Sequence, residues 1–91
     1  MTTYCGVDFH ARQQTSCYCD MVDGVIHCRE LHHEQDDVGG FYSQFTGNVI
    51  IGLEANGYTT WFVELLESIG HQVWLGDATE IRRRARRRQN L

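Results

Sequence analysis

Two acidic residues stand in apolar segments, and their positions suggest metal-ion chemistry. Asp8 lies in GVDFHA and Glu54 lies in VIIGLEA. An unpaired carboxylate inside an apolar strand is costly in free energy. Each acid follows a glycine by two positions, so in a β-strand it shares a face with Gly6 or Gly52 and has space beside it. If the two strands are parallel neighbours, the carboxylates meet at one edge of the sheet.

Two adjacent carboxylates repel each other, and a bound divalent cation relieves that repulsion. Ligand sets made only of oxygen favour Mg²⁺ or Mn²⁺ over zinc. Asp8 and Glu54 are therefore the candidate catalytic and metal-binding residues for chemistry on a phosphodiester, in which metal ions activate the attacking oxygen and stabilise the leaving one. The alternatives are a turn or cap aspartate at Asp8 and a salt-bridged loop residue at Glu54.

Basic side chains concentrate at the C-terminal end of the sequence. Residues 1–81 contain twelve acids and two arginines, whereas residues 82–91 contain six arginines and no acid. Like charges this dense are stabilised when a polyanion neutralises them, and a merely solvated face is the alternative. His10, on the face of Asp8, is a further candidate for a phosphate contact, with a surface histidine as the alternative. The arginines expected to bind nucleic acid, largely independently of base sequence, are Arg82, Arg83, Arg84, Arg86, Arg87 and Arg88.

The cysteines and tryptophans are expected to be structural. No export signal precedes the four cysteines, which favours reduced thiols in the core over a disulfide framework. Zinc binding is an alternative because histidines lie near the cysteines in the sequence, but the spacing of these residues matches no zinc knuckle. Trp61 and Trp74 have apolar flanks and are expected in the core. The cysteines are Cys5, Cys17, Cys19 and Cys28.

The first part of the chain predicts an antiparallel meander. Ninety-one residues allow one small domain. Asp23-Gly24 is a strong hairpin signal between the second and third strands. Asp36 or Asp37 can then cap a short helix that includes Phe41, Tyr42 and Phe45. The three strands are expected at residues 3–10, 15–22 and 25–31.

The second part predicts a strand, helix and strand crossover. The nearly continuous apolar run at 49–55 indicates an internal strand covered on both faces. Asn56-Gly57 turns the chain into a helix at about 58–69, ended by Gly70, and HQVWLG forms the next strand. Asp77 then caps a basic helix at about 78–90. No stretch is long and apolar enough for a membrane span, and a cytoplasmic location is expected.

The runs CGVDFHARQQTSCYCDMVDG and IGLEANGYTTWFVELLESIGHQVWLGDATEIRRRAR closely resemble the N-terminal domain of DEDD transposases of the insertion-sequence one-hundred-and-ten family. The resemblance extends from about Tyr4 to Arg88. It is carried by two motifs in combination. One is a strand that ends in GxD with a following histidine, and the other is a later strand that ends in GLEA before an aromatic-rich helix.

The resemblance implies an α/β fold of the ribonuclease H type, similar to that of Holliday-junction resolvases. In this fold a mixed five-stranded sheet has three antiparallel strands and then two parallel ones, with flanking helices and an acidic tetrad that binds magnesium. Asp8 matches the first tetrad acid and Glu54 the second. Members of the family look like DNA recombinases that act in transposition with a structured guide RNA. DNA, such an RNA, a second copy of the chain and a full-length transposase are the partners implied.

The remaining two tetrad acids and a serine-bearing C-terminal domain would fall beyond Leu91. We therefore expect a single incomplete domain, residues 1–91, of a truncated transposase that binds Mg²⁺ or Mn²⁺ weakly and is inactive alone. The alternative function is a non-catalytic remnant that binds DNA or RNA through its arginines. A fragment of an actin-like phosphotransferase is a more distant alternative, because that superfold also begins with a GxD strand.

Overall fold

The computed structural model describes residues 2–20, 24–35 and 37–76, which form five strands and two α-helices. No helix within these ranges has the length and apolar character needed to cross a membrane. The basic helix expected at about 78–90 lies outside the described residues. In chain order the elements are β1 (Thr2–Phe9), β2 (Gln13–Asp20), β3 (Ile26–His32), a 3₁₀ turn η1 (His33–Gln35), α1 (Asp37–Ser43), β4 (Asn48–Glu54), α2 (Thr60–Ile69) and β5 (Gln72–Gly76).

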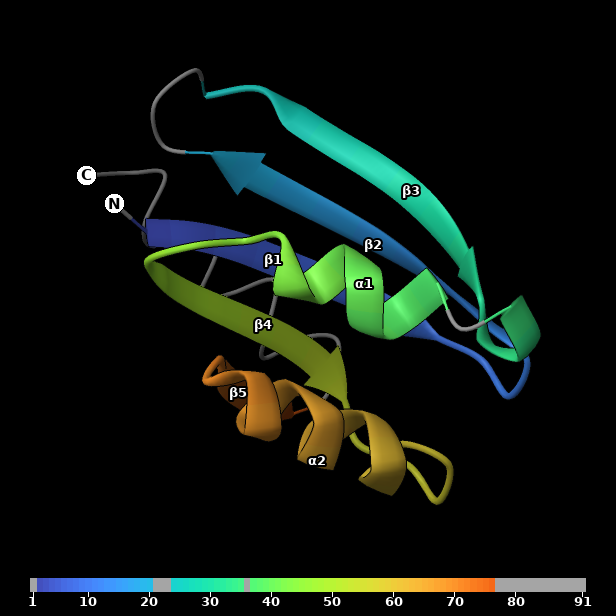
Figure 1. The fold of residues 1–91 in the computed structure, drawn as a ribbon. Coiled ribbons are helices and arrows are strands. Elements are labelled where there is room, and N and C mark those ends of the chain that lie inside the picture. Colours follow the sequence, from blue (N-terminus) through green and yellow to red (C-terminus); the bar gives the residue numbers. More distant parts are fainter. Residues whose placement is uncertain (1, 21–23, 36, 77–91) are drawn as a thin grey trace.

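The strands form one mixed sheet in the order β3-β2-β1-β4-β5 (Figure 1). β1, β2 and β3 pair antiparallel, and β4 runs parallel to both β1 and β5. The predicted sheet of three antiparallel strands followed by two parallel strands, with flanking helices, is confirmed. β1 is the middle strand, because it pairs with β2 on one side and with β4 on the other.

The core lies between one face of this sheet and the two helices, which Figure 1 shows on the same side. Side chains alternate between the faces of a strand, so every second residue of β1 points to the helices. β4 buries five consecutive residues, Val49–Leu53, as expected for an internal apolar strand. The side chains that form the core cluster include Cys5, Val7, Phe9, Val49, Ile51 and Leu53 from the sheet, Val38, Phe41 and Tyr42 from α1, and Phe62 and Leu66 from α2.

The turn before α2 is built by Asn56. Its side-chain Oδ1 accepts the backbone N–H of Tyr58 at 2.8 Å, and its carbonyl oxygen accepts the Thr59 hydroxyl at 2.9 Å. Such side-chain bonds compete with helical ones and hold a turn. The helix therefore begins at Thr60, two residues later than predicted.

The end of α2 is the predicted one. Gly70 has a φ of 102°, a left-handed conformation that favours glycine. The N–H of Gly70 donates to the Glu67 carbonyl and the N–H of His71 donates to the Leu66 carbonyl, each at 3.0 Å. This is the Schellman pattern, which satisfies the last carbonyls of a helix and releases the chain into β5.

α1 is shorter than predicted. It ends at Ser43, so Phe45, expected inside the helix, lies after it. Gly39 and Gly40 lower the helical preference of this segment, which explains the early end. Phe45 still packs on the helix, with its ring centroid 5.2 Å from that of Phe41.

The hairpin between β2 and β3 is wider than a two-residue turn. The strands end at Asp20 and begin again at Ile26, and Cys19 lies opposite Ile26. Gly24 has a φ of 68°. Asp23, predicted to form this turn with Gly24, lies outside the described residues, as does Asp36, a candidate cap of α1.

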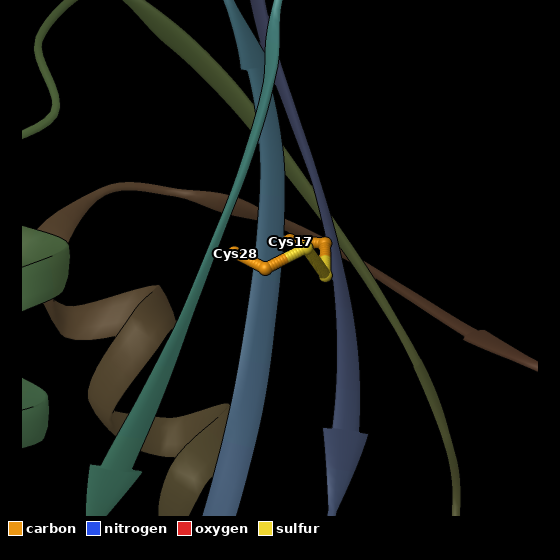
Figure 2. Close-up of a disulfide and its surroundings, with 2 residues drawn as sticks. All are labelled: Cys17 and Cys28. Carbon is orange, nitrogen blue, oxygen red and sulfur yellow. A yellow bond between two sulfur atoms is a disulfide. The ribbon is translucent and has the colours of Figure 1, made fainter.

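The expectation of four reduced core thiols is wrong for two cysteines. Cys17 and Cys28 lie directly opposite each other in β2 and β3 with Cα atoms 4.0 Å apart, and their sulfurs form a disulfide (Figure 2). Cys28 is exposed. Cys5 is a buried thiol, as expected, and Cys19 is a half-buried thiol. A bonded sulfur pair also rules out Cys17 and Cys28 as zinc ligands in this state.

Replacing Cys28 with serine is expected to lower the free energy of unfolding by about 2–3 kcal/mol under oxidising conditions. The disulfide joins residues 11 positions apart, and closing such a loop restricts the unfolded chain. Urea denaturation with and without dithiothreitol measures the effect. The reductant should destabilise the natural chain by the same amount and leave Cys28→Ser unchanged. Equal stability of the natural chain in both conditions would contradict this account.

Candidate active site at the carboxyl edge of the sheet

Asp8 and Glu54 come together at the carboxyl ends of β1 and β4. The parallel register pairs Gly6 with Gly52 and Val7 with Leu53, and each acid is the next residue of its strand. Registered residues of parallel neighbours share a face, and such strands lie about 4.8 Å apart. The two carboxylates were predicted to meet if the strands were parallel neighbours, and β1 and β4 are parallel neighbours. The catalytic and metal-binding roles of Asp8 and Glu54 stay predictions.

A glycine pair lies beside the two acids on the same face. Gly6 and Gly52 are directly opposite each other, and a Cβ added at Gly6 would meet no atom within 4 Å. The first strand therefore leaves room next to Asp8. Both acids are exposed, so a ligand that approached this face would reach their oxygens without displacing a core side chain.

His10 lies beside Asp8, on the face where the sequence placed it. Its Nε2 is 3.3 Å from the Asp8 Oδ2, and the two side chains are 59% and 76% exposed. A contact this exposed contributes about 0–1 kcal/mol, so a cation can replace the imidazole at small cost. His10 also fixes the turn between β1 and β2, because its backbone N–H donates to the Gln13 carbonyl at 2.8 Å.

A third carboxylate, which was not predicted from the sequence, lies on this face. Thr15 lies opposite Asp8 and Glu30 lies opposite Thr15, which places Glu30 in the same transverse row as the acid pair. The His32 Nε2 is 3.4 Å from the Glu30 Oε1, so an acid, a spacer and a histidine recur in β3 as in β1. That repeated spacing is the signal that could have found Glu30. The register of the β2–β3 hairpin, which places Glu30 in this row, could not be predicted from the sequence.

A chain of hydrogen bonds runs from the buried side chains of Tyr42 and Gln14 to the turn that follows Asp8. The Tyr42 hydroxyl donates to the Gln14 Oε1 at 2.7 Å, and Gln14 Nε2 lies 3.2 Å from the His33 Nε2. The His33 Nδ1 lies 3.1 Å from the Ala11 carbonyl oxygen, which can only accept. The Nδ1 of His33 therefore carries the hydrogen, and its Nε2 accepts from the Gln14 amide. The chain connects α1 through β2 to the turn that follows Asp8.

Two core groups close to this chain are kept protonated. Burial raises the pKa of the Cys5 thiol to about 12 and also raises the pKa of the Tyr42 hydroxyl. A thiol in this state is not a nucleophile at neutral pH. Cys5 is therefore a core residue and contributes no chemistry to the site.

The described part of the chain holds two arginines, one on β3 and one in the turn after β1. Arg29 extends over the Phe41 ring with its guanidinium carbon 5.6 Å from the ring centroid, a cation–π contact on the helix face. Arg12 lies in the turn after β1 and lines a surface pocket with Gln13 and His32. The six arginines expected to bind nucleic acid, Arg82, Arg83, Arg84, Arg86, Arg87 and Arg88, lie outside the described residues.

Trp61 is a surface residue, contrary to expectation, because it lies in the first turn of α2 at the edge of the core. Its side chain is 44% exposed, and Tyr58 just before the helix is 66% exposed. The apolar flanks of Trp61 suggested burial, but only Phe62 beside it reaches the centre of the core. Trp74 is half-buried.

The two carboxylates on this face are of the kind that bind a hard cation together with water and substrate oxygens. Within residues 2–20, 24–35 and 37–76, no cluster of three or more His, Cys, Asp or Glu side chains could enclose a metal ion. Mg²⁺ is commonly held by one or two carboxylates together with water and substrate phosphates. Asp8 and Glu54 fit that pattern and would be the two protein ligands.

No protein-family model matches this chain, and no curated protein matches it. The fold and the carboxylate pair therefore carry the assignment of function.

Proposed function

We propose that the chain is the N-terminal part of the ribonuclease H-like catalytic domain of a DEDD transposase, in which Asp8 and Glu54 hold Mg²⁺ against a DNA phosphodiester. The observation that carries the proposal is the register of β1 and β4. It brings two carboxylates to one edge and one face, next to a glycine pair.

The sheet order supports the ribonuclease H-like assignment. Three antiparallel strands, a helix, and then a strand, helix and strand crossover give the order β3-β2-β1-β4-β5, with the acids on the middle strand and its parallel neighbour. This is the architecture that the resemblance to DEDD transposases implies. Ligands of α/β sheets commonly bind outside the carboxyl ends of the strands, where these acids lie.

Each residue at the edge has a separate task in this proposal. The metal ion, when bound, would activate the attacking oxygen and stabilise the leaving one. Asp8 and Glu54 orient the ion, and the space over Gly6 admits the phosphate. His10, next to Asp8, is placed to donate a hydrogen bond to a phosphate oxygen. With two carboxylates as the protein ligands, the affinity for the ion is expected to be weak.

The test is titration of the full chain with Mn²⁺, followed by electron paramagnetic resonance, and with Mg²⁺ by competition. Asp8→Asn and Glu54→Gln are each expected to weaken binding at least tenfold, because each removes a charged ligand but keeps the shape. Glu67→Gln is the matched control, an exposed acid on α2, and should leave binding unchanged. Equal affinity of all four proteins would overturn the metal role.

The second candidate is nucleic-acid binding without catalysis, favoured by the six arginines and no acid in residues 82–91. Such binding needs no divalent ion and does not depend on Asp8. It falls steeply with salt because it releases counterions from the phosphates. Oligonucleotide binding that is equal in EDTA and in Mg²⁺, and equal for Asp8→Asn and the natural chain, selects this function over the first.

A further inference from the structure

Two large aromatic side chains are exposed at the same edge of the molecule as the carboxylate pair. Tyr58 is 66% exposed and lies in the turn that follows Glu54. Trp61 is 44% exposed and lies in the first turn of α2. Aromatic side chains bury a large apolar area when they can, so two exposed ones only three positions apart in the sequence suggest a contact with another molecule.

The backbone of Tyr58 and the ring of Trp61 are held in place before any ligand arrives. The backbone of Tyr58 is fixed by its hydrogen bond to the Asn56 Oδ1 at 2.8 Å. The ring of Trp61 packs against Phe9 at 5.9 Å between centroids and meets the edge of His33 at 5.1 Å, with the ring planes 81° apart. A preorganised surface loses little conformational entropy on binding.

The aromatic pair is linked to the acids by one strand. Phe9, which supports Trp61, directly follows Asp8 in β1, and the side chains of consecutive strand residues point to opposite faces. Trp61 therefore lies over the helix side of the strand end that carries Asp8 on its other side. A flexible polymer that bends over this edge can contact both.

We propose that Tyr58 and Trp61 form a stacking platform for the bases of an unpaired nucleic-acid strand whose phosphate lies at the Asp8 and Glu54 pair. The choice of nucleic acid rests on the proposed function. Bases stack on aromatic side chains whatever their sequence, and each such contact is worth about 1–3 kcal/mol. Duplex bases are already stacked on one another, so the ligand is single-stranded or locally opened.

An apolar protein partner fits this surface less well. Among residues 2–20, 24–35 and 37–76, the other exposed large apolar side chains lie elsewhere, with Val25 and Ile26 at the far end of the β2–β3 hairpin and Leu75 on β5. The residues next to the platform, Asn56 and Thr60, are polar and exposed. Stable protein interfaces need a broad contiguous area, whereas a base needs one ring face.

The experiment uses the intrinsic fluorescence of Trp61 in the full chain carrying Trp74→Phe, in EDTA so that no metal contributes. A single-stranded oligonucleotide is expected to quench the emission and bind. A strand of equal length and charge built from abasic sites, and a duplex, are expected to bind at least tenfold more weakly. Equal binding of the abasic strand would show that phosphates alone are recognised and would overturn the proposal.

Variants test the two rings separately. In titrations that follow the anisotropy of a labelled strand, Tyr58→Ser and Trp61→Leu are each expected to weaken binding of the base-bearing strand about tenfold and to leave the abasic strand unaffected. Leu75→Ser, which changes an exposed apolar residue on β5, is the control and should bind normally. If Trp61→Leu disturbs folding, Tyr58→Ser decides, because that side chain is mostly in solvent. Unchanged binding by Tyr58→Ser, or a self-association that either variant abolishes, would contradict the platform.

The stacking platform and the metal role of the proposed function are tested by different measurements, so either can be contradicted without the other. Tyr58→Ser is expected to lose base-dependent binding in EDTA and to keep the Mn²⁺ affinity of the natural chain, because Tyr58 is not one of the proposed metal ligands. Loss of the metal role alone therefore leaves the stacking result standing, and loss of base dependence alone leaves the metal result standing.

Discussion

Replacing Gln14 with leucine is expected to destabilise the protein by about 3–5 kcal/mol, a large fraction of the stability of a domain this size. Gln14 is fully buried, and its side chain joins the Tyr42 hydroxyl to the His33 ring. Leucine has a similar volume but removes the Gln14 acceptor of the buried Tyr42 hydroxyl and the Gln14 donor to the His33 Nε2. A buried polar group without a partner costs about 1–3 kcal/mol.

Urea denaturation of a double-mutant cycle measures this effect. Adding Tyr42→Phe to Gln14→Leu removes the orphaned hydroxyl, so the double variant is expected to be at least about 1 kcal/mol more stable than the two single effects predict when summed. Gln13→Leu is the control on the same strand, an exposed residue expected to change stability by less than about 0.5 kcal/mol. Additive effects in the cycle would show that the Tyr42 and Gln14 side chains are not coupled.

Replacing Gly6 with valine is expected to leave the fold intact and to weaken Mg²⁺-dependent oligonucleotide binding at least tenfold. A Cβ at Gly6 meets nothing within 4 Å, and glycine weakens a strand interior, so thermal stability should stay equal or rise. The added side chain fills the space next to Asp8 that the phosphate is proposed to enter. Thermal melting and oligonucleotide titrations in Mg²⁺ and in EDTA separate the two effects.

Gly40→Ala is the matched control for Gly6→Val. Gly40 lies within α1, and a Cβ there also meets nothing within 4 Å. Alanine is expected to stabilise the helix by about 0.5–1 kcal/mol without a change in binding. A Gly6→Val protein that binds in Mg²⁺ as tightly as the natural chain would place the phosphate away from the glycine pair.

The elements were predictable from local patterns of residues. The apolar run of β4, the helical spacing of α2 and the stop at Gly70 each depend on a few neighbouring residues. The pairing of Asp8 with Glu54 was predictable for a different reason. Both acids follow a glycine by two positions at the end of an apolar strand, so parallel pairing was enough to bring them together.

The features that were missed depend on register and tertiary contacts. A two-residue turn at Asp23-Gly24 would put Cys19 opposite Cys28. The longer connection instead puts Cys17 there, and the disulfide follows from that shift. Glu30 was missed for the same reason, because its place in the acidic row is set by the hairpin register. The bond from Tyr42 to Gln14 joins residues 28 positions apart, and no local pattern predicts such a contact.

The parallel pairing of β1 and β4 has a consequence for how the protein is made. β1, β2 and β3 are consecutive hairpin partners and can pair as soon as they leave the ribosome. β1 cannot pair with β4 until much later, because Thr2 pairs with Asn48. Contacts this far apart in sequence form late, because a long loop must close first. Until then the middle strand exposes an unpaired edge, to which another nascent chain can add. The two carboxylates meet only once β4 pairs with β1.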